Sequence, residues 1–301
     1  MKEVDRTQSS IEDKISAKSE MTTSEREFLY GLLKIHRPRK ILEIGVAAGA
    51  GSIVLLQAVR DDQEALVYSM DLAEKHYSDP SKLTGYLVEE MTPELLNRWH
   101  LYTGKLCYAF LEQLGMRFDF VVLDTAHYLP GEALDYIMFH PFLAKNALLV
   151  IHDIGYSQVA LKKRKLRKFK EHRDQNACLQ LLSVLKGQKI YPPYTEYPYF
   201  PNIAAIRLPE AIDENIDNIF SILSLPWSNR IQDEYALREI SPFLRKYYGA
   251  ERAKKWENIL DFQAAQLDYE KELKSLWGLA RIACKKYWNS LNKPRPWKRR
   301  S

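Results

Sequence analysis

The chain has 301 residues and a formal net charge of +5, and 46% of its residues are hydrophobic, which is typical of a globular protein rather than a disordered one. This length is enough to bury a large core and suits one large domain with a smaller attachment. No apolar run approaches the roughly 18 residues of a membrane span, and the start MKEVDRTQSSIEDK lacks the apolar middle of a secretory signal, so we expect a cytoplasmic protein.

The N-terminal segment divides into an arm and a helix. Residues 1–21 are polar and without periodicity, which predicts a mobile arm. Ser24 and Glu27 then have the spacing of a capping box ahead of FLYGLLKI, in which Phe28, Leu32 and Ile35 can share one helix face. We therefore expect a helix that leads into the first apolar run.

From residue 40 onward, short apolar runs alternate with helical patterns. The runs that read as strands are KILEIGV (40–46), ALVYSMDL (65–72), WHLYTG (99–104), FDFVVLD (118–124) and ALLVIHD (147–153). This alternation predicts an α/β protein with a Rossmann-like, doubly wound, mostly parallel sheet that has helices on both faces. Ligands bind such sheets at the carboxyl ends of the strands. Glu43, Asp71, Asp124 and Asp153 lie at or near these ends.

The turn after the first strand is unusually rich in glycine. Gly45, Gly49 and Gly51 allow backbone to approach a ligand closely, but their spacing is not the G-x-G-x-x-G of a dinucleotide site. Another nucleoside-bearing ligand is therefore indicated, with Asp71 placed to accept hydrogen bonds from ribose hydroxyls. The alternative is that the glycines serve only a tight turn and that Asp71 caps the next segment.

Two stretches carry a family resemblance. LEIGVAAGAGS resembles the E-x-G-x-x-x-G motif of class I S-adenosylmethionine-dependent methyltransferases, and VVLDTAHY with LLVIHD resembles the catechol O-methyltransferase-like branch, which acts on small molecules or sugars. The resemblance covers about residues 22–208 and implies a seven-stranded sheet whose last strand, near residues 202–208, is antiparallel. It also implies contacts to S-adenosylmethionine. The residues implied are Glu43, Gly45, Gly49, Gly51 and Ser52 for the methionine part, Asp71 for the ribose and Gly104 for the adenine.

His127 is the candidate catalytic base. It lies three residues after Asp124, at the place where the catechol enzymes carry a lysine base. A histidine titrates near neutrality, which suits removal of a hydroxyl proton before methyl transfer. The alternative is an ordinary hydrogen-bonded histidine near the start of a helix.

Asp124 and Asp153 also raise the possibility of a metal site. Carboxylates from neighbouring strand ends can hold Mg²⁺. In the catechol enzymes an asparagine follows such a pair, whereas here Ile154 stands in that place and His152 precedes Asp153, a set better suited to Mn²⁺. The alternatives are that Asp153 is a solvated carboxylate or that it orients His127.

The three cysteines are Cys107, Cys178 and Cys284. They are an odd number, are widely separated and form no C-x-x-C pair. This pattern indicates free thiols and neither a disulfide framework nor a zinc site.

Two segments suggest possible substrate contacts. The basic run 162–170 reads as a solvated helix face or as a positive surface for an anionic substrate. No nucleic-acid-binding module accompanies this charge, so we expect no nucleic-acid partner. The stretch YPPYTEYPYFPN (191–202) reads either as a substrate-facing loop or as aromatic side chains that pack on the domain.

Residues 209–301 read as a helical extension. The last helix has an apolar side that indicates packing within the chain or a homo-oligomer, with peripheral membrane contact as the alternative. Its members are Leu276, Leu279, Ala280, Ala283, Tyr287 and Leu291. The sequence as a whole predicts an S-adenosylmethionine-dependent O-methyltransferase for a small molecule or sugar. The alternative is a non-catalytic cofactor-binding or scaffolding module with the same fold.

Overall fold

The computed structural model describes residue 15 and residues 19–156, 176–195, 201–209, 215–227 and 237–291. The chain divides into two compact units, residues 1–229 and residues 230–301. We describe each unit by itself. The basic run 162–170 and residues 196–200 of the tyrosine-rich stretch lie outside the described residues.

The first unit contains a seven-stranded sheet with the order β3-β2-β1-β4-β5-β7-β6. In chain order the strands are β1 Lys40–Ile44, β2 Leu66–Asp71, β3 Trp99–Thr103, β4 Phe118–Leu123, β5 Leu143–His152, β6 Gln188–Ile190 and β7 Ile203–Arg207. Strands β1 to β5 are parallel, whereas β7 pairs antiparallel with both β5 and β6. The predicted α/β fold and the antiparallel last strand are confirmed. The sequence did not predict β6, because a strand of three residues has no periodicity to read.

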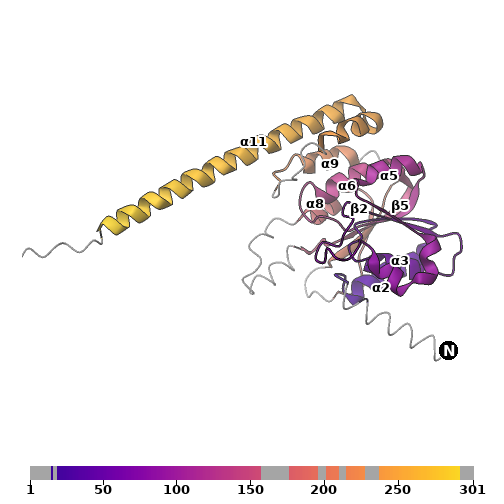
Figure 1. The fold of residues 1–301 in the computed structure, drawn as a ribbon. Helices are drawn as coiled ribbons and strands as arrows, with labels where there is room; N and C mark the ends of the chain where they lie inside the picture. The colour runs from indigo at the N-terminus through magenta and orange to yellow at the C-terminus, as the bar shows by residue number, and fades with distance from the viewer. Residues whose placement is uncertain are drawn as a thin grey trace, which may run out of the picture. The chain divides into compact units, whose positions relative to one another are not determined.

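Helices cover both faces of this sheet (Figure 1). α2 and α3 pack together on one face, and α5, α6, α8 and α9 form the layer on the other. Their bounds are α2 Thr23–His36, α3 Ala50–Ala58, α4 Tyr86–Met91, α5 Cys107–Leu114, α6 Gly131–Phe139, α8 Ala177–Val184 and α9 Ile216–Leu223, with 3-10 helices at Pro93–Arg98 and His140–Phe142. Because α9 contacts α6 and α8, the first unit continues past the domain boundary expected near residue 208.

The central strands are buried on both faces, which explains their continuous apolar sequences. Successive side chains of a strand point to opposite sides of the sheet. Ile41 and Phe120 join the core beneath α2 and α3, while the next residue on each strand, Leu42 and Val121, is equally buried. The sheet is therefore a rigid base whose strand ends position the loops.

The start of α2 differs from the predicted capping box. Thr22 is the N-cap, its hydroxyl accepts from the Glu25 backbone N–H, and the Glu25 side chain accepts from the Thr22 N–H. The pair Ser24 and Glu27 is therefore the wrong assignment. Ile35 is also exposed rather than on the packed face. The same T-x-x-E spacing occurs two residues earlier, and tertiary contacts of Glu25, described below, favour that start.

Two residues of the predicted N-terminal arm, Ile15 and Met21, are packed. Ile15 and Met21 are buried in the core beneath α2 and α3. The Arg26 guanidinium donates to the Met21 carbonyl, and the Met21 N–H donates to the Ser19 hydroxyl. Residues 1–14 and 16–18 lie outside the described residues. Ile15 and Met21 thus pack within the first unit, and the mobile arm stays a prediction.

The second unit is built around α11 (Ile240–Leu291), which consists of two helical segments that meet at a kink at Gly249, where φ is 86°. Trp256 is buried, and its Nε1 donates to the Leu237 carbonyl at 2.9 Å. The predicted apolar side is exposed at Leu276 and Leu279, and the side chains of the stripe beyond Ala280 are not described. None of the helices among the described residues is long and apolar enough to cross a membrane.

Candidate active site

The site lies at the carboxyl ends of β1 and β4, which are neighbours in the sheet although β2 and β3 come between them in sequence. From β1 the chain moves outward to β2 and β3, and it then returns to the other side of β1 as β4. This is the topological switch point, where parallel α/β sheets bind ligands.

Gly45 shows how closely the two strand ends approach each other. Its φ is +92°, and a Cβ atom at this position would lie 1.8 Å from the Asp124 carbonyl oxygen. No other residue type fits, because a real Cβ atom cannot approach an oxygen so closely. The glycine-rich turn after β1 and the polar residues after β4 are therefore parts of one site.

Asp71, at the end of β2, holds the glycine-rich turn in place. One carboxylate oxygen accepts from the backbone N–H groups of Val46 and Ala47, at 2.9 and 3.1 Å, and the other accepts from Ala73 at 2.8 Å. The Asp71 carbonyl accepts from the Gly104 N–H at 3.2 Å, so the predicted ribose and adenine residues are adjacent. Each carboxylate oxygen can accept further bonds, so the ribose contact stays a prediction.

Glu43 and Ser52 are buried behind the turn rather than displayed on it. The Glu43 carboxylate accepts from the hydroxyls of Ser52 and Ser69, at 2.5 and 2.6 Å, and the Trp99 Nε1 donates to Ser69. Burial raises the pKa of Glu43 to about 7, in spite of the two hydroxyl donors. Both residues therefore support the turn from behind, and their predicted direct contact with a cofactor is not evident in the geometry.

The remaining glycines complete the turn around this support. Gly49 is the N-cap of α3. Gly51, in the first turn of that helix, leaves so little room that an added Cβ would lie 2.6 Å from a Glu43 carboxylate oxygen. The turn, the helix start and the buried carboxylate are therefore packed as a unit.

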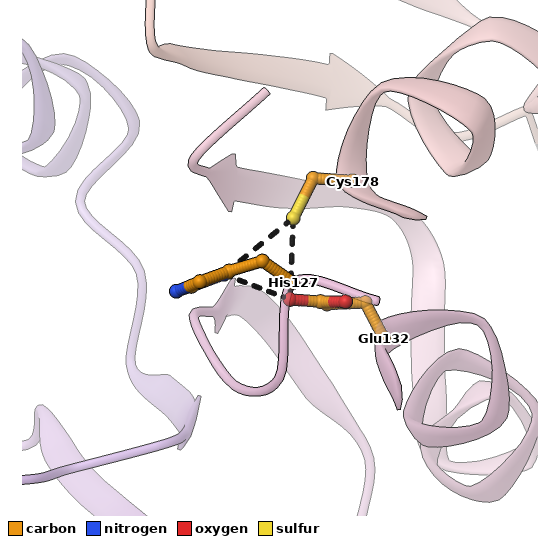
Figure 2. A group of neighbouring side chains, drawn as sticks. All are labelled: His127, Glu132 and Cys178. Atoms are coloured by element: carbon orange, nitrogen blue, oxygen red, sulfur yellow. Dashed lines mark hydrogen bonds and ion pairs between the residues drawn. The ribbon is translucent and has the colours of Figure 1, made fainter. Parts of the chain in front are cut away.

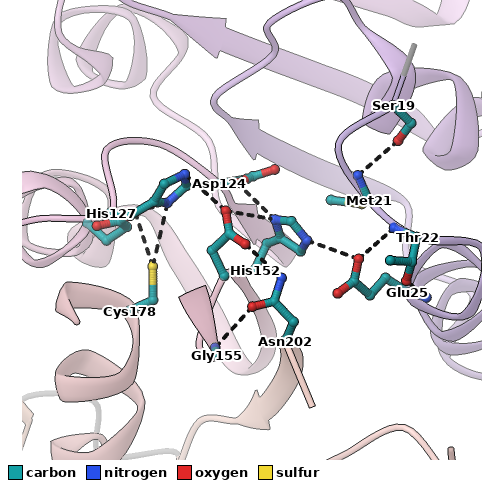
Figure 3. Close-up of polar contacts among 12 residues, drawn as sticks. Ser19, Met21, Thr22, Glu25, Asp124, His127, His152, Gly155, Cys178 and Asn202 are labelled. Atoms are coloured by element: carbon teal, nitrogen blue, oxygen red, sulfur yellow. Dashed lines mark hydrogen bonds and ion pairs between the residues drawn. The ribbon is translucent and has the colours of Figure 1, made fainter. Parts of the chain in front are cut away.

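After strands β4 and β5, carboxylates and imidazoles alternate in one cluster (Figure 3). His152 ends β5, its Nδ1 lies 3.1 Å from Asp124 Oδ1, and its Nε2 lies 3.4 Å from Glu25 Oε2. Burial alone would lower the pKa of His152, but Asp153 and Asp124 raise it well above the ordinary value. The sequence did not reveal Glu25 as a member of the site, because it belongs to α2 and its T-x-x-E spacing signals only a helix cap.

His127 lies between two other carboxylates. Its Nε2 is 3.0 Å from Asp153 Oδ2, its Nδ1 is 3.2 Å from Glu132 Oε1, and its ring stacks on Tyr156. Burial alone would lower the pKa of His127, but the hydrogen bonds to Asp153 and Glu132 raise it to about 11. The predicted role as a base stays a prediction, and this geometry favours a ring that donates from both nitrogens.

Asp153 is held from the far side by an asparagine that the sequence did not identify. The Asn202 Nδ2 donates to Asp153 Oδ1 at 2.7 Å, and its Oδ1 accepts from the Gly155 N–H. Burial would raise the pKa of Asp153, but His152, His127 and Asn202 hold it well below the usual range. Ile154, which stands where the catechol enzymes have asparagine, is buried. Asp153 is thus not a solvated carboxylate, and its contact with His127 matches the orienting role.

Asp124, His152 and Asp153 each offer an atom that lies within 4.8 Å of the other two. Two carboxylates and one imidazole suit Mn²⁺ better than Mg²⁺, which favours oxygen ligands only. These residues offer ligand types that a divalent ion accepts, and the metal itself stays a prediction. The side chain of Asp124 is 25% exposed and that of Asp153 only 9%, so Asp124 is the more accessible carboxylate.

The chain is similar to known proteins at the level of one family model and of several solved structures. The sequence model of the methyltransferase-domain family matches residues 42–154. An O-methyltransferase from Bacillus cereus, solved in complex with SAH (S-adenosylhomocysteine), is 17% identical with a TM-score of 0.47 and is aligned over 67% of this chain and 90% of its own. No curated protein sequence matches the chain.

Two further solved structures are similar at comparable levels. The SAH-bound methyltransferase PaMTH1 from Podospora anserina is 15% identical with a TM-score of 0.46 over 64% of this chain and 81% of its own. The O-methyltransferase TomG from Streptomyces achromogenes, in complex with SAM, is 15% identical with a TM-score of 0.45 over 62% and 81%. The match of residues 42–154 to the methyltransferase-domain family and the strand order described above agree in an α/β Rossmann-like methyltransferase fold.

Proposed function

We propose that the chain transfers a methyl group from S-adenosylmethionine to a hydroxyl of a small molecule or sugar. The observation that carries this proposal is the direct contact between Gly45, in the turn expected to face the methyl donor, and the backbone of Asp124, in the polar cluster. Methyl transfer is an in-line displacement, which requires donor and acceptor to be held within a few ångströms of each other. The glycine-rich turn after β1 and the polar cluster after β4 meet at Gly45, which satisfies this requirement.

Asp124 is the group that we assign to the acceptor hydroxyl. Its carboxylate is more accessible than those of Asp153, Glu25 and Glu132. His152 holds Asp124 Oδ1 at 3.1 Å, which leaves Oδ2 to orient a hydroxyl and accept its proton. In an alternative arrangement, a divalent ion held by Asp124, Asp153 and His152 would replace the hydrogen bond between His152 and Asp124 and would supply positive charge that lowers the pKa of a bound hydroxyl.

A second candidate function is a non-catalytic cofactor-binding module. Both ring nitrogens of His127 are engaged by carboxylates, so the residue at the place of the catechol enzymes' base has no free lone pair. If Asp124 does not accept the proton of the substrate hydroxyl either, the domain would bind the cofactor without transferring its methyl group.

Calorimetry and a turnover assay test the proposal together. S-Adenosylmethionine should bind the parent chain, and Asp71→Ala should weaken binding by about 1–3 kcal/mol, roughly 5- to 150-fold, because the turn loses its support and the ribose its acceptor. Asp61→Ala is the control, since Asp61 is 80% exposed and pairs only with Lys34 among its described contacts. NAD binding by the parent, or unchanged affinity in Asp71→Ala, would refute the cofactor assignment.

The turnover assay measures release of S-adenosylhomocysteine with a panel of catechol and sugar acceptors. Asp124→Asn should lower turnover by about two to four powers of ten while leaving cofactor affinity intact. Loss of activity in chelator, restored by Mn²⁺, would support the ion. Cofactor binding without acceptor-dependent turnover across the panel would favour the non-catalytic module.

A further inference from the structure

We propose that His127, Glu132 and Cys178 form a zinc-binding site. The three side chains come from different elements: His127 from the loop after β4, Glu132 from the first turn of α6 and Cys178 from the first turn of α8. Figure 2 shows them converging on one point. Imidazole, carboxylate and thiolate are the three ligand types that zinc uses in proteins.

The spacing of the ligand atoms fits a zinc ion. His127 Nδ1 and Glu132 Oε1 are 3.2 Å apart, Cys178 Sγ and Glu132 Oε1 are 3.2 Å apart, and Cys178 Sγ and His127 Nδ1 are 4.0 Å apart. Zinc bonds of about 2.0–2.3 Å in a tetrahedron place ligand atoms about 3.3–3.6 Å from each other. Each observed separation lies within about 0.5 Å of this range, so side-chain adjustment alone would complete the geometry.

Burial gives the site an electrostatic reason to hold a cation. Glu132 and Cys178 are both buried, and among the described residues Glu132 Oε2 has no hydrogen-bond partner. A carboxylate that keeps one oxygen unpartnered in the interior is costly, and a cation bound at its other oxygen, Oε1, would offset the buried charge. A Zn²⁺ ion would balance the charges of one carboxylate and one thiolate.

The surroundings of His127 match those of a metal-binding histidine. Zinc would displace the proton that His127 Nδ1 shares with Glu132, so that Nδ1 faces the ion while Nε2–H donates to Asp153 at 3.0 Å, and Asp153 is held in turn by Asn202. Such a carboxylate on the far side of the ring fixes the tautomer and orientation of a metal ligand. The His127 carbonyl also accepts from the Ala177 N–H, which ties the start of α8 to the same loop.

The thiolate distinguishes this site from the aspartate pair. Soft sulfur selects zinc over Mg²⁺ and Mn²⁺, whereas Asp124 and Asp153 favour the harder ions. Three protein ligands leave one position of the tetrahedron for water or a substrate oxygen. The site does not depend on the proposed methyl transfer, since every feature above is a property of the three side chains and their neighbours.

The experiment is zinc binding by the full chain after treatment with chelator. Elemental analysis after zinc addition and gel filtration should find one zinc per chain, and Co²⁺ in its place should show a thiolate-to-cobalt charge-transfer band. Cys178→Ala should lose the band and weaken zinc binding by at least about 100-fold, and Glu132→Gln should weaken it as well. Cys107→Ala is the matched control, because Cys107 is an equally buried free cysteine outside the cluster.

Several outcomes would overturn the assignment. These are no bound zinc in the parent chain, equal zinc binding by Cys178→Ala and Cys107→Ala, or zinc lost in Asp124→Asn but retained in Cys178→Ala. Circular dichroism of each variant confirms folding, and Glu132→Gln decides the matter if Cys178→Ala does not fold. Cys178-dependent zinc binding without methyl transfer would support this site while refuting the proposed function.

Discussion

Glu43 illustrates how a single buried charge organises the cofactor side of the site. Its carboxylate lies behind the glycine-rich turn and accepts hydrogen bonds from the hydroxyls of Ser52 and Ser69. It also lies so close to Gly51 that a side chain there would collide with it. Burial disfavours the ionised form, which raises the pKa of Glu43 to about 7. Glu43 therefore supports the turn from behind, and the cofactor contact expected from the sequence stays a prediction.

This pKa predicts a pH dependence of stability. The folded pKa is raised, so the stabilisation is complete below the unfolded value of 4.5 and is lost as pH rises toward about 7. Between these limits the parent chain should lose up to about 3 kcal/mol more unfolding free energy than Glu43→Gln, which keeps an acceptor for the serines and has no charge. Denaturant unfolding from pH 4 to pH 8 measures the difference. Parallel pH profiles for the two proteins would contradict it.

At the scale of the helices, α3 depends on a glycine that α2 does not need. Gly51 in α3 lies against the Glu43 carboxylate, whereas Gly31 in α2 would meet no atom within 4 Å if it gained a Cβ. Both are helical residues, so an intrinsic preference for alanine applies to each. Their surroundings are therefore expected to give alanine substitutions at the two positions opposite effects on stability.

Gly51→Ala should destabilise the chain by about 1–3 kcal/mol, because the new methyl group would displace a buried, hydrogen-bonded carboxylate. Gly31→Ala should stabilise it by about 0.5–1 kcal/mol, since alanine costs less conformational entropy in a helix. Midpoints and slopes of urea unfolding give both values. Equal or greater stability of Gly51→Ala would show that the site behind the turn is looser than described.

At the scale of the whole molecule, the two units have separate structural supports. The sheet and its glycine-rich turn belong to the first unit, and the second is held by buried side chains such as Trp256. Beyond these, Leu276, Trp277 and Leu279 are exposed on α11. An exposed apolar surface on a helix is typical of a contact with another chain or with a lipid surface.

We expect truncation after Lys271 to lower the oligomeric state or the solubility without changing cofactor affinity. Packing driven by apolar burial persists at high salt, so the association of the intact chain should survive it. Light scattering at low and high salt, with calorimetry on the truncated chain, measures both properties. Salt-sensitive sedimentation with anionic vesicles, lost on truncation without any change in association, would instead assign α11 to a membrane surface.

The sequence by itself determined the features that are written in consecutive residues. The apolar runs predicted β1 to β5, and the family resemblance implied the antiparallel last strand near residues 202–208. The glycine spacing predicted a bare turn after the first strand. These predictions succeeded because period, strand length and terminal residue are local properties that survive folding unchanged.

Only the tertiary structure decided which side chains meet. Glu25 and His152 are 127 residues apart, Asp153 and Asn202 are 49 apart, and Glu132 and Cys178 are 46 apart. The three widely separated cysteines did not indicate the proposed zinc site, because no other ligand lies near Cys178 in sequence. Lateral strand order and helix packing bring these residues together, and a linear pattern carries no record of that order. Local sequence patterns therefore predict the fold, whereas the chemistry depends on contacts that form only when the sheet is assembled.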